Sequence, residues 1–441
     1  MESVLLFIVG VLVVAVGLVV SIALHELGHF APAKLFGVRV GQFMIGFGPT
    51  IVSWRRGETE YGFKWIPLGG YISMSGMYPP VAGRAARTAS TGFFETLVQD
   101  ARSASADTIA VGEDHRAFYR LPVWKRVIVM LGGPVMNLVI AVVLYAVVLM
   151  GFGIAVPSTT LGTVYECVQP ATSEAQECSP DDPLAPGAAA GLQPGDRILA
   201  IDGQAVTAWE DIPAVVRESA GEPLSVTIER DGEQVETTLT PLLTERYVVN
   251  DRGEIAEGPN GEQLTERVGF IGIAPAYETV QQPVTEVLPA VGDNVVRVTE
   301  IIIALPQRMV EVAQAAFGTE ERDPNGPISV VGVGRIAGEI AALDTIPIVD
   351  RVSSLLGLLA GLNVALFVFN LIPLLPLDGG HIAVALIEAL RRRFAALVGK
   401  PDSGPLDTAK LVPFTLAVVM VLGVMSLLLI YADIVKPISL F

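Results

Sequence analysis

The chain has 441 residues, too many for one ordinary domain, and 51% of them are hydrophobic. Its formal net charge is −17, and acidic residues gather in one block: residues 152–351 carry 32 Asp and Glu against 11 Arg and no Lys. An acidic chain without a basic stripe argues against nucleic acid as a partner. Composition therefore predicts a polytopic membrane protein with a separate polar domain.

The chain begins with a long apolar run. Ser3–Leu24 carries no charge, and a helix over this run would be ~33 Å long at ~1.5 Å per residue, enough to cross a bilayer. The run lacks a basic start and a small-residue cleavage site, which a secretory signal peptide would have. We therefore expect residues 1–30 to be a retained first transmembrane helix.

This run leads directly into His25-Glu26-Leu27-Gly28-His29, which has the HExxH spacing of zinc hydrolases. On a continuing helix both imidazoles lie on one face and can hold a tetrahedral metal, while Glu26 is a candidate general base. Ionisable groups near a span are costly, which favours a functional role. The alternative is a surface helix that carries two histidines by chance.

Residues 31–126 form the next region, with 12 Lys and Arg against 7 Asp and Glu. Two strand-like runs flank the turn Arg55–Glu58 and predict a β-hairpin within residues 46–76. The hairpin is either a plain cytoplasmic hairpin or a sheet edge that reaches the metal. Residues 77–122 lack periodicity and predict a flexible loop.

Three further uncharged runs, Val127–Val156, Val352–Leu377 and Leu411–Ala432, predict three more transmembrane regions, at residues 123–156, 351–390 and 411–435, with a cytoplasmic loop at 391–410. Basic residues near the span ends cluster on one side, which the positive-inside rule makes cytoplasmic. The N-terminus, the acidic block and the C-terminus then lie outside. The basic residues are Lys34, Arg39, Lys125, Arg126 and Arg391–Arg393.

Residues 157–283, within the acidic block, are long enough for a core of their own. Ala190–Gly203 reads as a turn, a short strand and a second turn, followed by a helix at Trp209–Ala220 and a hairpin at Leu224–Gly232. This series resembles a PDZ domain with a β extension. Its peptide groove is expected near Gly191–Ile198, where N–H groups of a turn could hold a C-terminal carboxylate.

Residues 284–350 predict amphipathic helices, interrupted by Pro289 and Pro306, and a linker. The chain has two cysteines, Cys167 and Cys178, both in the block assigned to the outside. In an oxidising compartment such a pair predicts a local disulfide; the alternative is two free buried thiols.

A third candidate metal ligand, Asp378, ends the third apolar run. It follows two prolines that must break or bend the helix, and broken backbone at membrane depth is tolerated where it is buried in protein or lines a wet cavity. Because Asp378 is expected on the same side of the membrane as HExxH, a ligand role is favoured over a plain interfacial acid. His381 is the rival third ligand.

Four motifs now occur in a recognisable order: HELGH in a first span, LGGPVMN in a second, a PDZ-like domain, and FNLIPLLPLDGGH in a third. This order resembles the bacterial site-2 protease family, the intramembrane zinc metalloproteases. The resemblance implies one zinc ion held by His25, His29 and Asp378, with Glu26 as the catalytic base. It implies that Asn370 helps to bind substrate and that the hairpin is membrane-reentrant.

The fold class we predict is a polytopic α-helical membrane protein with four transmembrane helices, a membrane-associated β-hairpin and an extracytoplasmic PDZ-like β-rich domain. The resemblance implies a multi-pass protein of the bacterial cytoplasmic membrane with its active site toward the cytoplasm. It further implies regulated intramembrane proteolysis in signal transduction and stress response. The partners implied are the lipid bilayer and single-span membrane proteins, such as anti-sigma factors already cut once, or remnant signal peptides.

Other functions fit parts of the pattern. Two histidines and one carboxylate also suit a non-haem iron enzyme, which metal analysis would distinguish. A non-catalytic PDZ membrane receptor would not need an intact HExxH motif and Asp378. A transporter with broken helices is the third alternative, but no inverted repeat is visible.

Overall fold

The computed structural model describes residues 2–79, 93–173, 178–249, 255–256, 258, 262–319, 322–324, 326–401 and 404–438. The chain divides into two compact units, which are treated separately below. Unit 1 combines Met1–Phe152 with Pro283–Phe441, and unit 2 is Gly153–Gln282.

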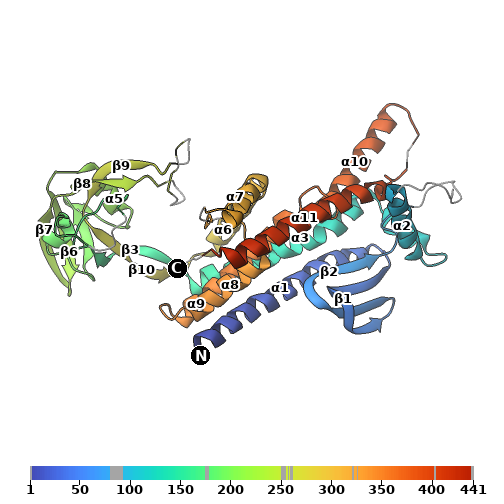
Figure 1. Ribbon diagram of the computed structural model, residues 1–441, viewed down its shortest axis with the longest axis horizontal. Coiled ribbons are helices and arrows are strands. Elements are labelled where there is room, and N and C mark those ends of the chain that lie inside the picture. The colour runs from blue at the N-terminus through green and yellow to red at the C-terminus, as the bar shows by residue number, and fades with distance from the viewer. Residues whose placement is uncertain are drawn as a thin grey trace. The chain divides into compact units, whose positions relative to one another are not determined.

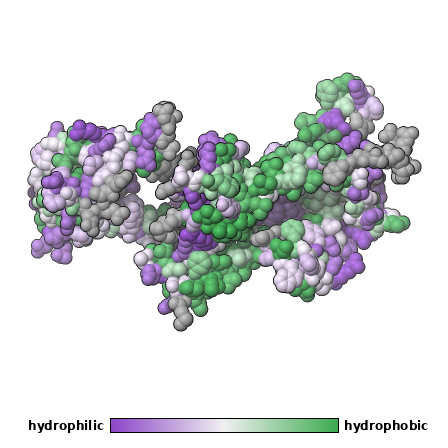
Figure 2. Space-filling model, in the orientation of Figure 1, coloured by the Kyte–Doolittle hydropathy of each residue, from purple (hydrophilic) through white to green (hydrophobic). Residues whose placement is uncertain are grey.

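In the described part of the chain, four helical segments are long and apolar enough to cross a membrane (Figure 1). Apolar side chains cover much of the visible surface of these helices, as a lipid environment requires (Figure 2). The four predicted spans therefore occur as helices, the third ending at Asn370 rather than at 390. They are α1 (Glu2–Leu35), α3 (Val123–Ala146, continued by a π-helical turn Val147–Phe152), α9 (Ile348–Asn370) and α11 (Val412–Val435, preceded by a 3₁₀ turn Thr408–Leu411).

Among the described residues, five further helices belong to unit 1. They are α2 (Phe93–Asp107), α6 (Val287–Ile303), α7 (Leu305–Phe317), α8 (Val330–Ala342) and α10 (Asp378–Leu397). Three short 3₁₀ turns complete the unit at Asp114–Arg116, Phe118–Arg120 and Val284–Glu286.

These helices correct several predicted boundaries. The prediction of a loop over 77–122 is wrong where α2 forms, and residues 80–92 lie outside the described residues. Helix α10 continues to Leu397, into the predicted loop at 391–410. Pro289 does not interrupt α6, because it lies in the first turn, where the missing N–H has no intrahelical partner to lose. The second span ends at Phe152 rather than 156, since a strand begins at Ile154.

The predicted hairpin is longer than residues 46–76 and folds back on itself. Strand β1 covers Val40–Arg56 and β2 covers Thr59–Met74, with the turn where the sequence predicted it. Met44 pairs with Tyr71 on one side and with Gly62 on the other, so β1 contacts both halves of β2. The bend in β1 uses the positive φ of Gly46 and Gly48.

Helices α1 and α3 cross with their backbones in contact. A Cβ on Gly28 would lie 2.2 Å from the Gly132 carbonyl oxygen, and a Cβ on Gly132 would lie 2.0 Å from that of Gly28. Only glycine fits at both positions, the arrangement that close helix packing in membranes uses. The crossing places the HExxH segment of α1 directly against the middle of α3.

Unit 2 is a β-rich domain with a core of its own around Leu161, Ile198, Val226 and Ile228. Its main sheet has the order β10-β3-β4-β6-β7, β5 pairs with β4, and β8 and β9 form a separate hairpin. The strands are β3 (Ile154–Val164), β4 (Arg197–Ile201), β5 (Gln204–Ala205), β6 (Leu224–Arg230), β7 (Glu233–Leu239), β8 (Leu242–Tyr247), β9 (Thr265–Phe270) and β10 (Ile273–Val280), with helices α4 (Pro186–Ala189) and α5 (Asp211–Glu218).

Two features of unit 2 bear on the sequence predictions. Cys167 and Cys178 are joined by a disulfide bond. The cavity described in this unit, of about 310 Å³, lies between α5 and the β8–β9 hairpin, with Val216, Arg246 and Phe270 among its lining residues. It does not involve Gly191–Ile198, so the predicted position of a peptide groove is not where this cavity lies.

A buried ion pair ties α10 to α3. The Arg126 guanidinium donates to both carboxylate oxygens of Glu388, at 3.1 and 2.5 Å, and Glu388 is fully buried. Glu388 also accepts from the Leu406 amide and pairs with Arg392. Since removing one partner leaves a buried charge, this contact is expected to be costly to break.

We expect Arg126→Leu to lower the free energy of unfolding by about 3 kcal/mol, the lower end for a broken buried pair because Arg392 remains. The matched control is Arg120→Leu, which removes an exposed pair with Asp114 and is expected to cost under about 1 kcal/mol. Melting of both purified variants in the same detergent measures the difference. Equal melting temperatures would contradict a stabilising role for the buried pair.

Candidate metal centre

The HExxH residues lie on one continuous helix. Because α1 runs from the first span through Leu35, His25 and His29 share a face, and their Nε2 atoms are 3.2 Å apart. The motif is mostly shielded from solvent, with Glu26 9% and His29 5% exposed. The predicted helical presentation of the two histidines is therefore what the structure contains.

Asp378 reaches this pair from the far end of the chain. It is the first residue of α10, after the chain leaves α9 at Asn370 and turns through an irregular segment. A Cβ on Gly379 would lie 2.3 Å from the Leu371 carbonyl oxygen, so the small residues after Asp378 permit the tight turn. The Asp378 Oδ2 atom lies 3.4 Å from His25 Nε2 and 3.2 Å from His29 Nε2.

These three atoms fit a tetrahedral zinc ion. Two ligands at ~2.05 Å from one ion are ~3.3 Å apart, close to the observed separations of 3.2 to 3.4 Å. Asp378 Oδ2 is buried and has no hydrogen-bond donor among the described residues. A Cβ on Gly133 would lie 2.2 Å from His29 Nε2 and 2.7 Å from His25 Nε2, so glycine leaves this side of the nitrogens open. The donor set therefore suits zinc.

The second nitrogen of His29 supports the same assignment. His29 Nδ1 lies 2.8 Å from the Val129 carbonyl oxygen of α3, which can only accept a hydrogen bond. Nδ1 must then carry the proton, which leaves the Nε2 lone pair free to face Asp378 and a metal. The geometry thus fixes the tautomer that a zinc ligand needs.

Glu26, next to His25 on α1, lies against strand β2 of the β1–β2 sheet. A Cβ on Gly70 would lie 2.9 Å from Glu26 Cγ, so strand β2 passes directly beside this carboxylate. A carboxylate next to two metal ligands, with an extended strand alongside, has the placement of a general base near a bound peptide.

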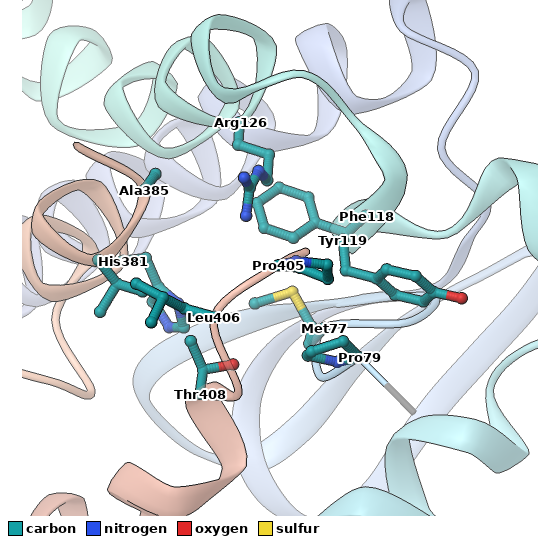
Figure 3. Close-up of a pocket in the computed structure, with 11 residues that line it drawn as sticks. Met77, Pro79, Phe118, Tyr119, Arg126, His381, Ala385, Pro405, Leu406 and Thr408 are labelled. Atoms are coloured by element: carbon teal, nitrogen blue, oxygen red, sulfur yellow. The ribbon is translucent and has the colours of Figure 1, made fainter. Parts of the chain in front are cut away.

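His381, the rival third ligand, lies elsewhere. Among the described residues, the group that could hold a metal comprises His25, His29 and Asp378. His381 instead lines a cavity of about 20 Å³, room for about one water molecule, with Tyr119, Arg126 and Leu406 (Figure 3). Asn370, the predicted substrate-binding residue, is the last residue of α9 and does not belong to the group of three that could hold a metal.

Two residues near the site were missed by the sequence reasoning. Gly133 and Asn137 belong to the LGGPVMN motif of α3, and Asn137 Nδ2 lies 3.1 Å from His25 Nδ1. A polar residue in the middle of an uncharged span is the signal that could have identified Asn137.

The sequence matches known metalloproteases along its length. The family model for Peptidase family M50 matches residues 13–400. The chain is 36% identical to "Zinc metalloprotease Rip1" of Mycobacterium tuberculosis, over 99% of this chain and 100% of that protein. It is 34% identical to the protein of the same name in Mycolicibacterium smegmatis, with the same coverage, and 29% identical to "Metalloprotease MmpA" of Caulobacter vibrioides, over 87% of this chain and 89% of that one.

The third ligand can be tested by paired substitutions. We expect Asp378→Asn to lose bound zinc, because a neutral amide is a poor zinc ligand, while His381→Ala keeps one zinc per chain. Elemental analysis of purified protein measures the metal and also distinguishes zinc from iron. If His381→Ala loses the metal and Asp378→Asn retains it, the ligand assignment is wrong.

Proposed function

The chain belongs to peptidase family M50 and is a zinc metalloprotease embedded in the membrane, and from this we propose that it cuts the transmembrane segments of single-span proteins. One observation carries the proposal: three metal-ligand atoms converge at the end of a transmembrane helix, where a soluble protease has no need of them. In this assignment His25, His29 and Asp378 hold the zinc and Glu26 is the catalytic base.

The mechanism follows from these roles. When zinc is bound, the site gains a Lewis acid that lowers the pKa of water to roughly 7 and polarises the scissile carbonyl. Glu26 takes the proton from the attacking water and returns it to the leaving amine. His25, His29 and Asp378 would hold the zinc with a single ligand negative charge, so the metal and its ligands would carry a net positive charge that could stabilise an oxyanion.

A transmembrane substrate must unwind before it can be cut, because its carbonyls are hydrogen-bonded within a helix. Unwound backbone in a membrane needs new partners. In β2, residues 70–72 pair with β1 on one side and pass beside Glu26, so the other side can add an extended substrate strand. This use of a sheet edge, together with Asn370 at the end of α9, is our proposal for substrate binding.

The proposed orientation rests on the basic residues near the span ends. They make the side with Arg126 and Arg391–Arg393 cytoplasmic, which leaves both termini and unit 2 outside the bacterial cytoplasmic membrane. The disulfide of unit 2 suits an oxidising exterior. Substrates would then be anti-sigma factors after a first cleavage outside, or remnant signal peptides.

Unit 2 is proposed to act as a PDZ-like gate. Its antiparallel sheet, its helix α5 and the apolar cavity beside α5 support this assignment. A folded block of this size on the outer side can exclude substrates with bulky outer domains and admit trimmed ones.

The base is tested by Glu26→Gln. This variant keeps the shape of the site but cannot accept a proton, so we expect normal zinc content and at least a 100-fold lower cleavage rate. In cells, quantitative proteomics of wild type against the variant should show single-span fragments accumulating in the variant. Full cleavage by zinc-loaded Glu26→Gln would refute the assigned role.

The gating role of unit 2 is tested by a deletion whose two ends are paired in its main sheet. Leu161 and Pro275 are paired neighbours in β3 and β10, so a short Gly/Ser linker can replace the segment between them and retain the outer pairs Ile154–Val280 to Pro157–Tyr277. We expect the deletion variant to cut full-length substrates that wild type leaves intact, as gel analysis would show. The control is the same deletion with Glu26→Gln, which should cut nothing. A deletion that keeps zinc and wild-type selectivity would make unit 2 a static cap.

A further inference from the structure

Asn137 is a polar side chain buried inside a transmembrane helix. It lies near the middle of α3 and is 1% exposed. Its amide nitrogen, Nδ2, lies 3.1 Å from His25 Nδ1, and its amide oxygen, Oδ1, is buried without any hydrogen-bond partner among the described residues. A buried carbonyl oxygen without a partner is unfavourable and calls for an explanation.

This orientation of the amide also conflicts with the metal site. If Asn137 Nδ2 donates to His25 Nδ1, that nitrogen is an acceptor, and in neutral imidazole the proton must then sit on Nε2. A protonated Nε2 cannot bind a metal, yet this atom lies 3.4 Å from Asp378 Oδ2 and 3.2 Å from His29 Nε2. Exchanging the oxygen and nitrogen of the amide, which differ little in shape, removes the conflict with the metal site and gives the amide oxygen a donor, while the NH₂ group takes the oxygen's former buried position.

We propose that Asn137 is a positioning residue for the zinc site, with its carboxamide oxygen accepting a hydrogen bond from His25 Nδ1–H so that Nε2 is held free to bind the metal. The unpartnered oxygen then has a donor. The inference rests on the proposed zinc site and adds a residue that the HExxH and Asp378 motifs do not contain.

The arrangement of α3 supports a paired role. The Val129 carbonyl accepts from His29 Nδ1, and Asn137, eight residues later on the same helix, faces Nδ1 of His25. Helix α3 therefore contacts the Nδ1 atoms of both histidines, with a backbone carbonyl at His29 and with an amide side chain at His25. Gly132 and Gly133 lie between these contacts and bring α3 close enough to α1 for both to form.

The alternative is that Asn137 only packs between helices. Asn363 on α9 is a natural comparison, because it is also fully buried in a span and its Oδ1 likewise has no partner among the described residues, but its Nδ2 donates to Ser21 Oγ and to the Leu359 carbonyl rather than facing a histidine. A packing role predicts the same behaviour for both asparagines, whereas a positioning role predicts an effect on metal binding for Asn137 alone.

The test measures the zinc dissociation constant of full-length protein in detergent by competition with a chromophoric chelator. Asn137→Leu keeps the number and branching of the side-chain heavy atoms but has no acceptor, and we expect its zinc dissociation constant to rise about 10- to 100-fold. Asn137→Asp presents only acceptor oxygens and should bind zinc within about threefold of wild type or more tightly. The control Asn363→Leu should leave the constant within about threefold of wild type.

A second readout reports on the ligands themselves. Visible absorption of the Co²⁺-loaded proteins should be the same for wild type and Asn137→Asp, and altered in Asn137→Leu because His25 no longer holds its Nε2 in place. If Asn137→Leu does not fold, Asn137→Ser, whose shorter acceptor lies farther from His25, is expected to raise the zinc dissociation constant between about threefold and tenfold and to alter the Co²⁺ absorption.

The outcomes separate this inference from the proposed metal site. If Asn137→Leu, or Asn137→Ser in its place, matches wild type in both measurements, or if Asn137→Asp binds zinc as weakly as His25→Ala, the positioning role is refuted. If wild type itself binds no zinc, or if His25→Ala binds zinc as tightly as wild type, the metal site is refuted instead.

Discussion

The contact between the backbones of α1 and α3 is the constraint on which the site depends. At Gly28 and Gly132 neither helix has room for a side chain, so the HExxH turn lies flat against α3. Only at this distance can a backbone carbonyl and an amide side chain of α3 reach the outer nitrogens of the two histidines. Any larger residue at the crossing would separate the helices and remove these partners together.

The polar groups of the site are tolerated in an apolar setting because each is placed against another element. His29 has a carbonyl of α3, Asp378 faces two imidazole nitrogens, and Glu388 is matched by Arg126. In a bilayer no water is available to hydrogen-bond an unpaired charge or donor. Such pairs are therefore required for folding as much as for catalysis. The same requirement brings the polar groups of the site together where α1, α3 and α10 meet.

Much of the site could be predicted from the sequence, because the features concerned depend on residues close together in the chain. A bilayer demands a long uncharged run, and helical periodicity places His25 and His29 on one face whatever surrounds them. Other features depend on contacts between distant residues. Helix α2 has no long apolar stripe and packs on α11. The β1–β2 sheet folds back through bends at glycines. Asn137 contacts His25 although 112 positions separate them in the sequence. No pattern within a short window encodes such contacts.

Helix α3 therefore acts as the scaffold from which the ligands are arranged. It holds α1 by the glycine crossing, the histidines by hydrogen bonds, and α10 through the Arg126–Glu388 pair. Since Asp378 is the first residue of α10, fixing this helix also fixes the proposed third ligand. A site whose ligands are already oriented loses little conformational entropy when zinc binds, so more of the coordination energy appears as affinity. Bound zinc would in turn join α1 to α10, and at a zinc concentration of 100 times the dissociation constant it would add about 2.7 kcal/mol to folding stability.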